Sequence, residues 1–169
     1  MKKMFWVFGF IAALAVSAIA HASEIPTPRG EVVLTISGSI GKTNQNGSAV
    51  FDMTQLKAMP KKKYMTSTIW TDGTIVFEGV LLKDVLDNVE NSGSKIRAVA
   101  LNDYAADLTV RDATEDGPII AYQMNGEPMS VRQKGPLWIV FPYDDNPEYR
   151  TEATYAKSVW QLTRLHTSD

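Results

Sequence analysis

The segment from Tyr64 to Leu86 constrains the fold of this chain more than any other stretch. It has the pattern of a strand, a loop with Trp70-Thr71-Asp72-Gly73, a short strand ending in Phe77-Glu78-Gly79, and a helix. The helix carries four apolar residues at the i, i+3, i+4 and i+7 positions of one face: Leu82, Val85, Leu86 and Val89. Since that face can pack on a sheet, we expect the helix to fix the position of the preceding loop.

Trp70 allows two interpretations. A large aromatic ring beside the polar run Thr66-Ser67-Thr68 suits a flat ligand rich in heteroatoms, because the ring offers a stacking face and the hydroxyls offer hydrogen bonds. Tryptophan is also highly buried on average, so the same ring can belong to the core. The sequence leaves both interpretations open.

Residues 1–22 have the pattern of a secretory signal peptide. Lys2 and Lys3 precede an uncharged apolar stretch over residues 4–20, and Ala20-His21-Ala22 places small residues before a cleavage point ahead of Ser23. An uncleaved membrane anchor is the alternative. We expect cleavage, no membrane insertion of the mature chain, and a single domain over residues 23–169.

Charge and cysteine content exclude several kinds of function. Removal of Lys2 and Lys3 leaves 15 basic against 19 acidic side chains, which argues against nucleic acid as a partner. The chain has no cysteine, so it forms no disulfide and offers no thiolate to a metal or substrate. A signal-bearing chain without cysteine is typical of the bacterial periplasm, where we expect this protein.

The remaining pattern predicts many short strands and few helices. Asp52 and Gln55 have the spacing of a capping box, so a short helix is expected to begin at Asp52 and end at Pro60, with Lys61–Lys63 as a solvated turn. Asn125-Gly126 is a hairpin signal. The expected strands beyond the central segment cover residues 31–38, 96–101, 108–111, 119–123, 137–141 and 159–165, and residues 142–150 form a loop. Strands in no regular βαβ order indicate an α+β fold, a mixed and mostly β sheet with a few short helices.

Catalytic and metal-binding groups are scarce. The two histidines are His21, in the predicted signal peptide, and His166, near the last residue, so we expect no Ser-His-Asp triad, two-histidine zinc site or histidine base. Carboxylates at strand ends usually form turns. We therefore expect no catalytic residue and no metal site, and expect that the protein is not an enzyme.

Loops between strands carry aromatic and polar residues that together describe a binding pocket. Trp70 lies in the first loop, Asn102, Asp103 and Tyr104 in a second, Arg132 with Lys134 before Gly135-Pro136, and Tyr155, Ser158 and Trp160 near the last strand. We select Trp70, Asn102, Asp103, Tyr104, Arg132, Tyr155 and Ser158 as candidate binding residues. Arg132 can also be an ordinary surface cation, and Tyr104 and Tyr155 can belong partly to the core.

A family resemblance rests on motifs in a fixed order, and it covers about residues 30–165. The motifs are Trp70-Thr71-Asp72-Gly73, Phe77-Glu78-Gly79-Val80, Leu82-Lys83-Asp84-Val85-Leu86, Leu101-Asn102-Asp103-Tyr104-Ala105, Asn125-Gly126-Glu127-Pro128-Met129 and Gly135-Pro136-Leu137-Trp138. Together they resemble the molybdopterin-binding domain of sulfite-oxidase-type oxidoreductases.

Two departures distinguish this chain from the enzymes it resembles. The resemblance implies a molybdenum-ligating cysteine in the segment that here reads Met65-Thr66-Ser67-Thr68-Ile69-Trp70, and an arginine where this chain has Trp138. Hydroxyls are harder and weaker ligands than a thiolate, so we expect no catalytic cofactor. In these respects the chain is similar to periplasmic pterin-binding proteins, which bind free reduced pterins without a metal.

That similarity implies a ligand, a partner and roles for the candidate residues. The ligand would be a pterin of the neopterin or monapterin class, and the partner the periplasmic domain of an inner-membrane GGDEF/EAL protein that makes and degrades cyclic-di-GMP. Trp70 with Tyr104 or Tyr155 would stack on the ring, Asp103 would accept hydrogen bonds from its amino-pyrimidine edge, and Arg132 with Ser158 would meet its carbonyl or hydroxylated tail. Two alternatives stay open: a molybdopterin-dependent oxidoreductase subunit, and a protein-interaction domain without a ligand.

Overall fold

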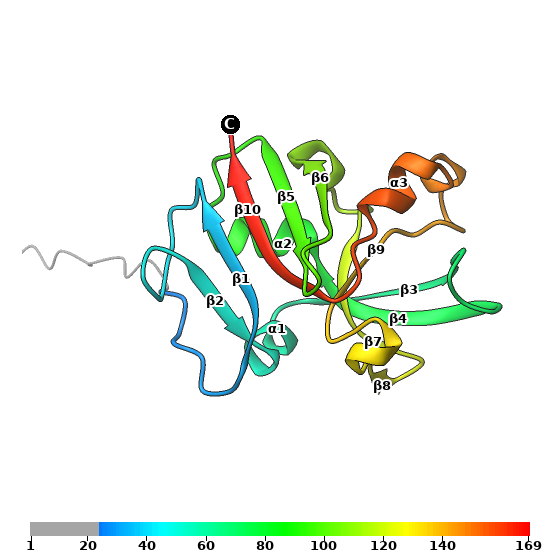
Figure 1. Ribbon diagram of the computed structural model, residues 1–169, viewed down its shortest axis with the longest axis horizontal. Helices are drawn as coiled ribbons and strands as arrows, with labels where there is room; N and C mark the ends of the chain where they lie inside the picture. Colours follow the sequence, from blue (N-terminus) through cyan, green and yellow to red (C-terminus); the bar gives the residue numbers. More distant parts are fainter. Residues whose placement is uncertain (1–23) are drawn as a thin grey trace, which may run out of the picture.

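Two β-sheets form the framework of the protein in a computed structural model that describes residues 24–169 (Figure 1). The predicted signal peptide, residues 1–22, lies outside the described residues. The first sheet has the strand order β2-β1-β10-β5-β6, and the second has β3-β4-β7-β8 with β9 paired to β7. The expected α+β class, mostly β with a few short helices, is confirmed.

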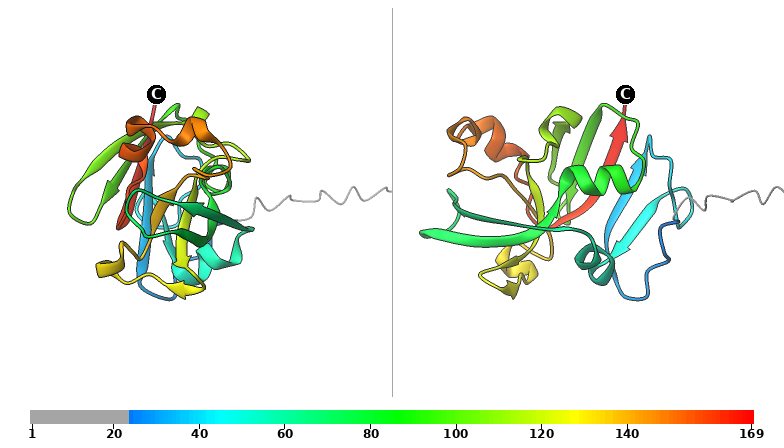
Figure 2. Two further views of the ribbon diagram at one scale, coloured as in Figure 1. Left: turned by 90° about the vertical axis from the view of Figure 1, so that its right-hand side faces the viewer. Right: turned by 180° about the vertical axis from the view of Figure 1, so that it is seen from behind.

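The first sheet joins segments far apart in the sequence. β10 lies at its centre, parallel to β1 and antiparallel to β5, and the other pairs are antiparallel. Figure 2 shows α2 across one face of this sheet. The strands are β1 Val32–Gly38, β2 Ala49–Asp52, β5 Lys95–Ala100, β6 Ala105–Thr109 and β10 Leu162–Ser168, and the helix is α2 Leu82–Asn88.

The second sheet is antiparallel, and its long β3–β4 hairpin extends toward α3 (Figures 1 and 2). Its strands are β3 Lys61–Ser67, β4 Thr74–Leu81, β7 Ile119–Met124, β8 Glu127–Pro128 and β9 Trp138–Val140. The remaining helical segments are α1 Met53–Ala58, α3 Glu152–Lys157 and the short 3₁₀ turns η1 Val110–Asp112, η2 Val131–Gln133 and η3 Pro147–Tyr149.

The predicted helix after Asp52 is confirmed together with its capping box. The Asp52 carboxylate accepts from the backbone N of Gln55 at 2.8 Å, and the Gln55 side chain accepts from the backbone N of Asp52 at 2.9 Å. The same carboxylate accepts from the backbone N of Arg29 and Gly30. The backbone hydrogen bonds from Gln55 and Gly30 lower the pKa of Asp52. One side chain therefore begins α1 and anchors the segment before β1.

The prediction of a solvated turn at Lys61–Lys63 is wrong, because these residues begin β3. β3 pairs with β4 alone in its sheet, and lysines are tolerated on such an edge strand because their side chains reach solvent. The ammonium groups of Lys61 and Lys63 lie 3.7 and 2.9 Å from the Glu78 carboxylate on the neighbouring strand. Composition alone does not distinguish this arrangement from a turn.

The segment from residue 142 onward departs most from the sequence prediction. Residues 152–157 form α3, which no pattern indicated, and the last strand runs over Leu162–Ser168 instead of residues 159–165. Thr151 caps α3 by accepting from the backbone N of Thr154 at 3.2 Å. A helix of six residues has no room for a recognisable apolar period, so its cap is the main local signal.

Close backbone packing fixes the centre of the second sheet. The register of β4 against β7 shifts between Glu78 and Gly79. A Cβ atom on Gly79 would lie 2.2 Å from the backbone O of Ile120, closer than any side chain can approach. The Asn125-Gly126 hairpin turn is confirmed, with φ angles of 52° and 85° at these two residues.

Candidate functional site

A cavity of about 270 Å³ opens where the β3–β4 hairpin tip meets α3 and the turn after β5. We call it the aromatic cavity, because four of its seven lining residues are aromatic. Its lining consists of Trp70, Asn102, Tyr104, Tyr155, Ala156, Ser158 and Trp160. Its volume lies just below the roughly 300–1,000 Å³ of typical ligand pockets, which suits a small ring system.

Trp70 is both a cavity residue and part of the packed aromatic cluster. Its ring centroid lies 5.8 Å from that of Trp138, 5.7 Å from Tyr155 and 5.5 Å from Trp160, all in edge-to-face arrangements. Trp138 is fully buried and packs in turn on Phe77 of β4 at 5.3 Å. The two interpretations of Trp70 are therefore compatible, since this partly buried residue packs on the core and also lines the cavity.

The turn after β5 closes one side of the aromatic cavity. The Tyr104 hydroxyl donates to the backbone O of Ala156 at 2.9 Å, which ties this turn to α3. The backbone N of Tyr104 donates to Asn102 Oδ1 at 3.2 Å, and Asp103 between them has a φ of 62°. This local geometry orients the Asn102 amide and the Tyr104 ring before any ligand is present.

Ser158 forms the most buried part of the cavity wall. Its hydroxyl donates to the backbone O of Thr154 at 3.0 Å and hydrogen bonds with the hydroxyl of Tyr143. The indole N of Trp138 donates to the backbone O of Ser158 at 3.2 Å. Burial raises the pKa of Tyr143 to about 12. Ser158 therefore shapes the cavity, and its hydroxyl is already used inside the protein.

Other polar groups of the lining residues make no hydrogen bond within the described residues. The structure shows no hydrogen bond to any of residues 24–169 from Nδ2 of Asn102, the indole N of Trp70 or Trp160, or the hydroxyl of Tyr155. One side-chain amide, which can both donate and accept, thus lies among three additional donors and several aromatic faces.

Five of the seven predicted site residues line the aromatic cavity: Trp70, Asn102, Tyr104, Tyr155 and Ser158. Asp103 and Arg132 do not. The Asp103 carboxylate pairs with Arg164 Nη2 at 2.8 Å, and Arg132 is exposed in η2. The structure adds Ala156 and Trp160 to the lining. Trp160 carried a sequence signal, because it is an aromatic residue two positions after Ser158.

Lys134 places its ammonium group near two indole rings, one of which, that of Trp160, lines the aromatic cavity. Lys134 Nζ lies 5.9 Å from the ring centroids of both Trp138 and Trp160. Its backbone O accepts from the N of Gln161, which joins it to the residue after Trp160. At this distance the ammonium is within reach of a cation–π interaction with either indole.

The hydroxyl run at the end of β3 is used inside the protein. Thr66 Oγ1 accepts from the backbone N of Asp144, and Ser67 donates to the Asp144 carboxylate through its backbone N at 2.6 Å and its hydroxyl at 2.7 Å. Thr68 Oγ1 contacts Thr71 Oγ1 at 2.8 Å. Within the described residues, no cluster of three or more histidine, cysteine, aspartate or glutamate side chains could hold a metal.

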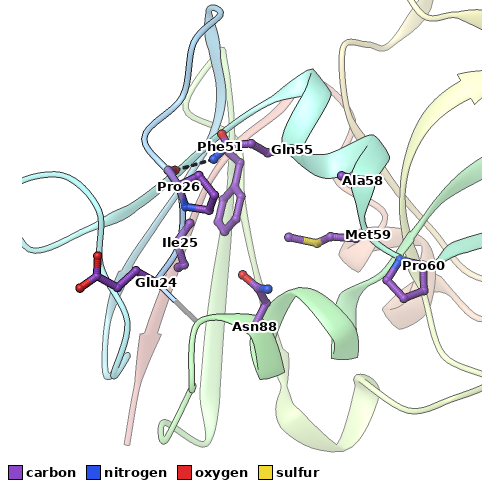
Figure 3. A pocket seen from close by; sticks show the side chains of 9 residues that line it. All are labelled: Glu24, Ile25, Pro26, Phe51, Gln55, Ala58, Met59, Pro60 and Asn88. Carbon is purple, nitrogen blue, oxygen red and sulfur yellow. Dashed lines mark hydrogen bonds between the residues drawn. The ribbon is translucent and has the colours of Figure 1, made fainter. Parts of the chain in front are cut away.

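A second hollow, of about 350 Å³, lies between the segment before β1 and the helices α1 and α2 (Figure 3). Phe51 forms its floor beside Ile25 and Met59, and the Gln55 side chain donates to the backbone O of Pro26 at its rim. The Phe51 ring is its one aromatic ring, and that residue is 1% exposed. This hollow offers little stacking surface, so the aromatic cavity is the stronger candidate for a ring-shaped ligand.

Comparison with known proteins agrees with the fold. The family model of the oxidoreductase molybdopterin binding domain matches residues 25–144. The chain is similar in structure to the sulfane dehydrogenase SoxCD from Paracoccus pantotrophus, with a TM-score of 0.62 and 18% sequence identity. The match covers 88% of this chain and 41% of that chain, so this protein spans about two fifths of its length. No curated protein sequence matches the chain.

Proposed function

Because this chain belongs to the oxidoreductase molybdopterin-binding domain family, we propose that its aromatic cavity binds a free, reduced pterin and that the protein itself catalyses no redox reaction. The observation that carries this proposal is the composition of the cavity wall. Four aromatic residues and the side-chain amide of Asn102, whose Nδ2 makes no hydrogen bond within residues 24–169, line a space of about 270 Å³.

The chemistry of a pterin suits this wall. A pterin is a planar bicycle with a lactam and an amino group along one edge, so it needs stacking faces and a donor-acceptor pair in one plane. Trp70, Tyr155 and Trp160 offer the faces, and the amide of Asn102 offers both a donor and an acceptor. We therefore assign to Asn102 the contact with the pyrimidine edge that the sequence suggested for Asp103.

The donor set does not fit a molybdenum ligand. The chain has no cysteine, and the hydroxyls that occupy the corresponding segment bind Asp144 or one another. To bind a metal, the Ser67 hydroxyl would have to give up its contact with Asp144, and it would still be a weaker ligand than a thiolate. This supports binding of the organic ring alone.

The wider biological role is also part of the proposal. The sequence pattern of residues 1–22 supports export to the periplasm, and no helix within residues 24–169 is long and apolar enough to cross a membrane. There the pterin-loaded protein would signal to the periplasmic domain of an inner-membrane GGDEF/EAL protein. The family resemblance supports this partner, and it also supports a ligand of the neopterin or monapterin class. The pterin can control the contact only if the partner binds the pterin-loaded and the pterin-free protein with different affinities.

The test is a titration of the purified protein with reduced neopterin and monapterin, followed by tryptophan fluorescence and calorimetry. Quenching with measurable heat is expected for wild type, and Trp70→Leu should weaken binding about tenfold or more, since base–aromatic stacking contributes about 1–3 kcal/mol per ring. Tyr149→Leu, which removes an aromatic ring outside the cavity, should bind like wild type. Absence of heat and quenching in wild type would refute the proposal.

The family match also favours a second candidate, a subunit that holds molybdopterin with its metal. Elemental analysis of protein purified from its native host separates the two. Molybdenum together with a dithiolene pterin would establish the second candidate, whereas a released pterin without metal supports the first. If neither appears and titration also fails, a protein-interaction domain without a ligand remains.

A further inference from the structure

Along its first five residues, β3 has a neighbouring strand on one side only among the described residues. β3 is the outermost strand of its sheet, and within the described part of the chain no other strand pairs beyond it. A hollow of about 490 Å³ lies beside this edge. Its lining consists of Lys62, Lys63, Tyr64, Asp116, Pro142, Asp145, Asn146 and Tyr149.

The register shows which backbone groups face outward. Val76 lies opposite Met65 on β4. Its backbone N donates to Asn125 Oδ1 and its backbone O accepts from the backbone N of Asn125, which lies on the β7 side. Val76 therefore makes no ladder hydrogen bond to Met65. Two residues further, the backbone N of Ser67 points outward to Asp144. Because hydrogen-bonded and non-hydrogen-bonded pairs alternate in antiparallel strands, the N–H and C=O of Lys63 and Met65 also point outward.

The side chains along this edge define the chemistry of a partner. Lys61 and Lys63 are 58% and 65% exposed and share the single carboxylate of Glu78, which is 14% exposed. On the strand face that Lys61 and Lys63 share, two ammonium groups thus stand against one carboxylate, whereas on the opposite face Lys62 pairs with Asp116 at 3.8 Å. Met65 is 68% exposed and lies directly opposite Val76, so the next position along the same face is apolar.

We propose that the edge of β3 between Lys61 and Met65 is a docking site for an extended acidic segment of a partner protein, which adds as a further strand. Backbone hydrogen bonds to Lys63 and Met65 would provide affinity, carboxylates opposite Lys61 and Lys63 would provide selectivity, and an apolar residue would cover Met65. A second copy of this chain is a poor occupant, because lysines would then oppose lysines.

The test uses ¹⁵N-labelled protein and a synthetic peptide with the alternating pattern Glu-Thr-Glu-Thr-Val. The amide signals of Lys63 and Met65 should shift on addition of this peptide, and a peptide with lysine in place of glutamate should bind at least about tenfold more weakly. Shifts confined to another strand edge, or no shift at millimolar peptide, would overturn the proposal.

Met65→Pro removes one outward N–H without touching the β3–β4 ladder, so it should keep the fold and weaken peptide binding about tenfold. Met65→Thr keeps the N–H and should retain most of the affinity. Unchanged binding by Met65→Pro, or a dimer of wild type that this variant abolishes, would contradict the assignment.

Charge reversal gives an independent test should the proline variant fail to fold. The double variant Lys61→Glu/Lys63→Glu should prefer the lysine peptide over the glutamate peptide. Lys42→Glu/Lys95→Glu, which changes the same charge next to the first sheet, should keep the wild-type preference. An unchanged preference in the first double variant would contradict the role of the two lysines.

Discussion

Ser67 and Asp144 join the end of β3 to the loop that follows β9. Both the backbone N and the hydroxyl of Ser67 donate to the Asp144 carboxylate, at 2.6 and 2.7 Å, and Arg150 Nη2 donates to the same carboxylate at 2.6 Å. This contact fixes the hairpin that carries Trp70 relative to the segment leading into α3. The shape of the aromatic cavity therefore depends on residues that do not line it.

Asp144→Asn should lower the free energy of unfolding by about 1–3 kcal/mol at pH 7, because it removes hydrogen bonds to a charged acceptor. The bonds from Ser67, followed by that from Arg150, lower the pKa of Asp144 from its ordinary value of 3.8. Its contribution is thus present above pH 3.8 and is lost as the pH falls through the lower native pKa. Denaturant unfolding at several pH values checks this, with exposed Asp145→Asn as the control.

Asn102→Ala should weaken pterin binding about 5- to 30-fold, because it removes the donor and the acceptor assigned to the pyrimidine edge. Asp103→Ala should change affinity less than about twofold, since its carboxylate pairs with Arg164 outside the cavity lining. Calorimetric titration of the two neighbouring variants measures both. The reverse order of effects would assign the edge contact to Asp103.

Tyr143→Phe should reduce the alkaline sensitivity of the protein. Burial raises the pKa of Tyr143 to about 12, so its neutral hydroxyl contributes stability below its ordinary pKa of 10, and that contribution is lost as the pH rises toward 12. Unfolding free energies at neutral and alkaline pH, followed with tyrosinate absorbance, should show a shallower decline in the variant. Tyr149→Phe, whose hydroxyl makes only a 3.4 Å contact with the backbone of Asp116, should keep the wild-type profile.

Gly79→Ala should destabilise the protein by at least about 1–3 kcal/mol, because the added methyl cannot fit against the Ile120 backbone without moving β4 from β7. Gly30→Ala is the matched control, since its Cβ would meet Asp52 at 3.5 Å, an ordinary contact. Thermal unfolding of the two variants compares them. Similar midpoints would show that the sheet adapts to the methyl group.

The sequence predicts those parts of the fold whose signals are local. The Asp52–Gln55 capping box, the Asn125-Gly126 turn and the apolar face of α2 each depend on neighbouring residues, and all three are present. β2 and α3 were not predicted, because a four-residue strand and a six-residue helix are too short for a distinct period. Lys61–Lys63 form part of a strand because they pair with β4, and composition does not reveal that pairing.

In the candidate site, too, the sequence indicates the residues with local signals and misses the contacts between distant residues. Trp70, Asn102 and Tyr104 were selected because aromatic and amide residues in loops are a local signal, and all three line the aromatic cavity. The orientation of the Asp103 side chain depends on the positive φ of this residue and on its pairing with Arg164, which is 61 residues away in the sequence. Such long-range pairing of charges cannot be read from spacing, and the same holds for the indole contacts of Lys134.

The central place of β10 in the first sheet has a consequence for the order of folding. β1 pairs with a strand 129 residues later, Ser37 beside His166, and β5 pairs with the other side of that same strand. Neither β1 nor β5 can complete its hydrogen bonds until residues 162–168 have left the ribosome. The high contact order predicts that the first sheet closes slowly and only after synthesis is complete.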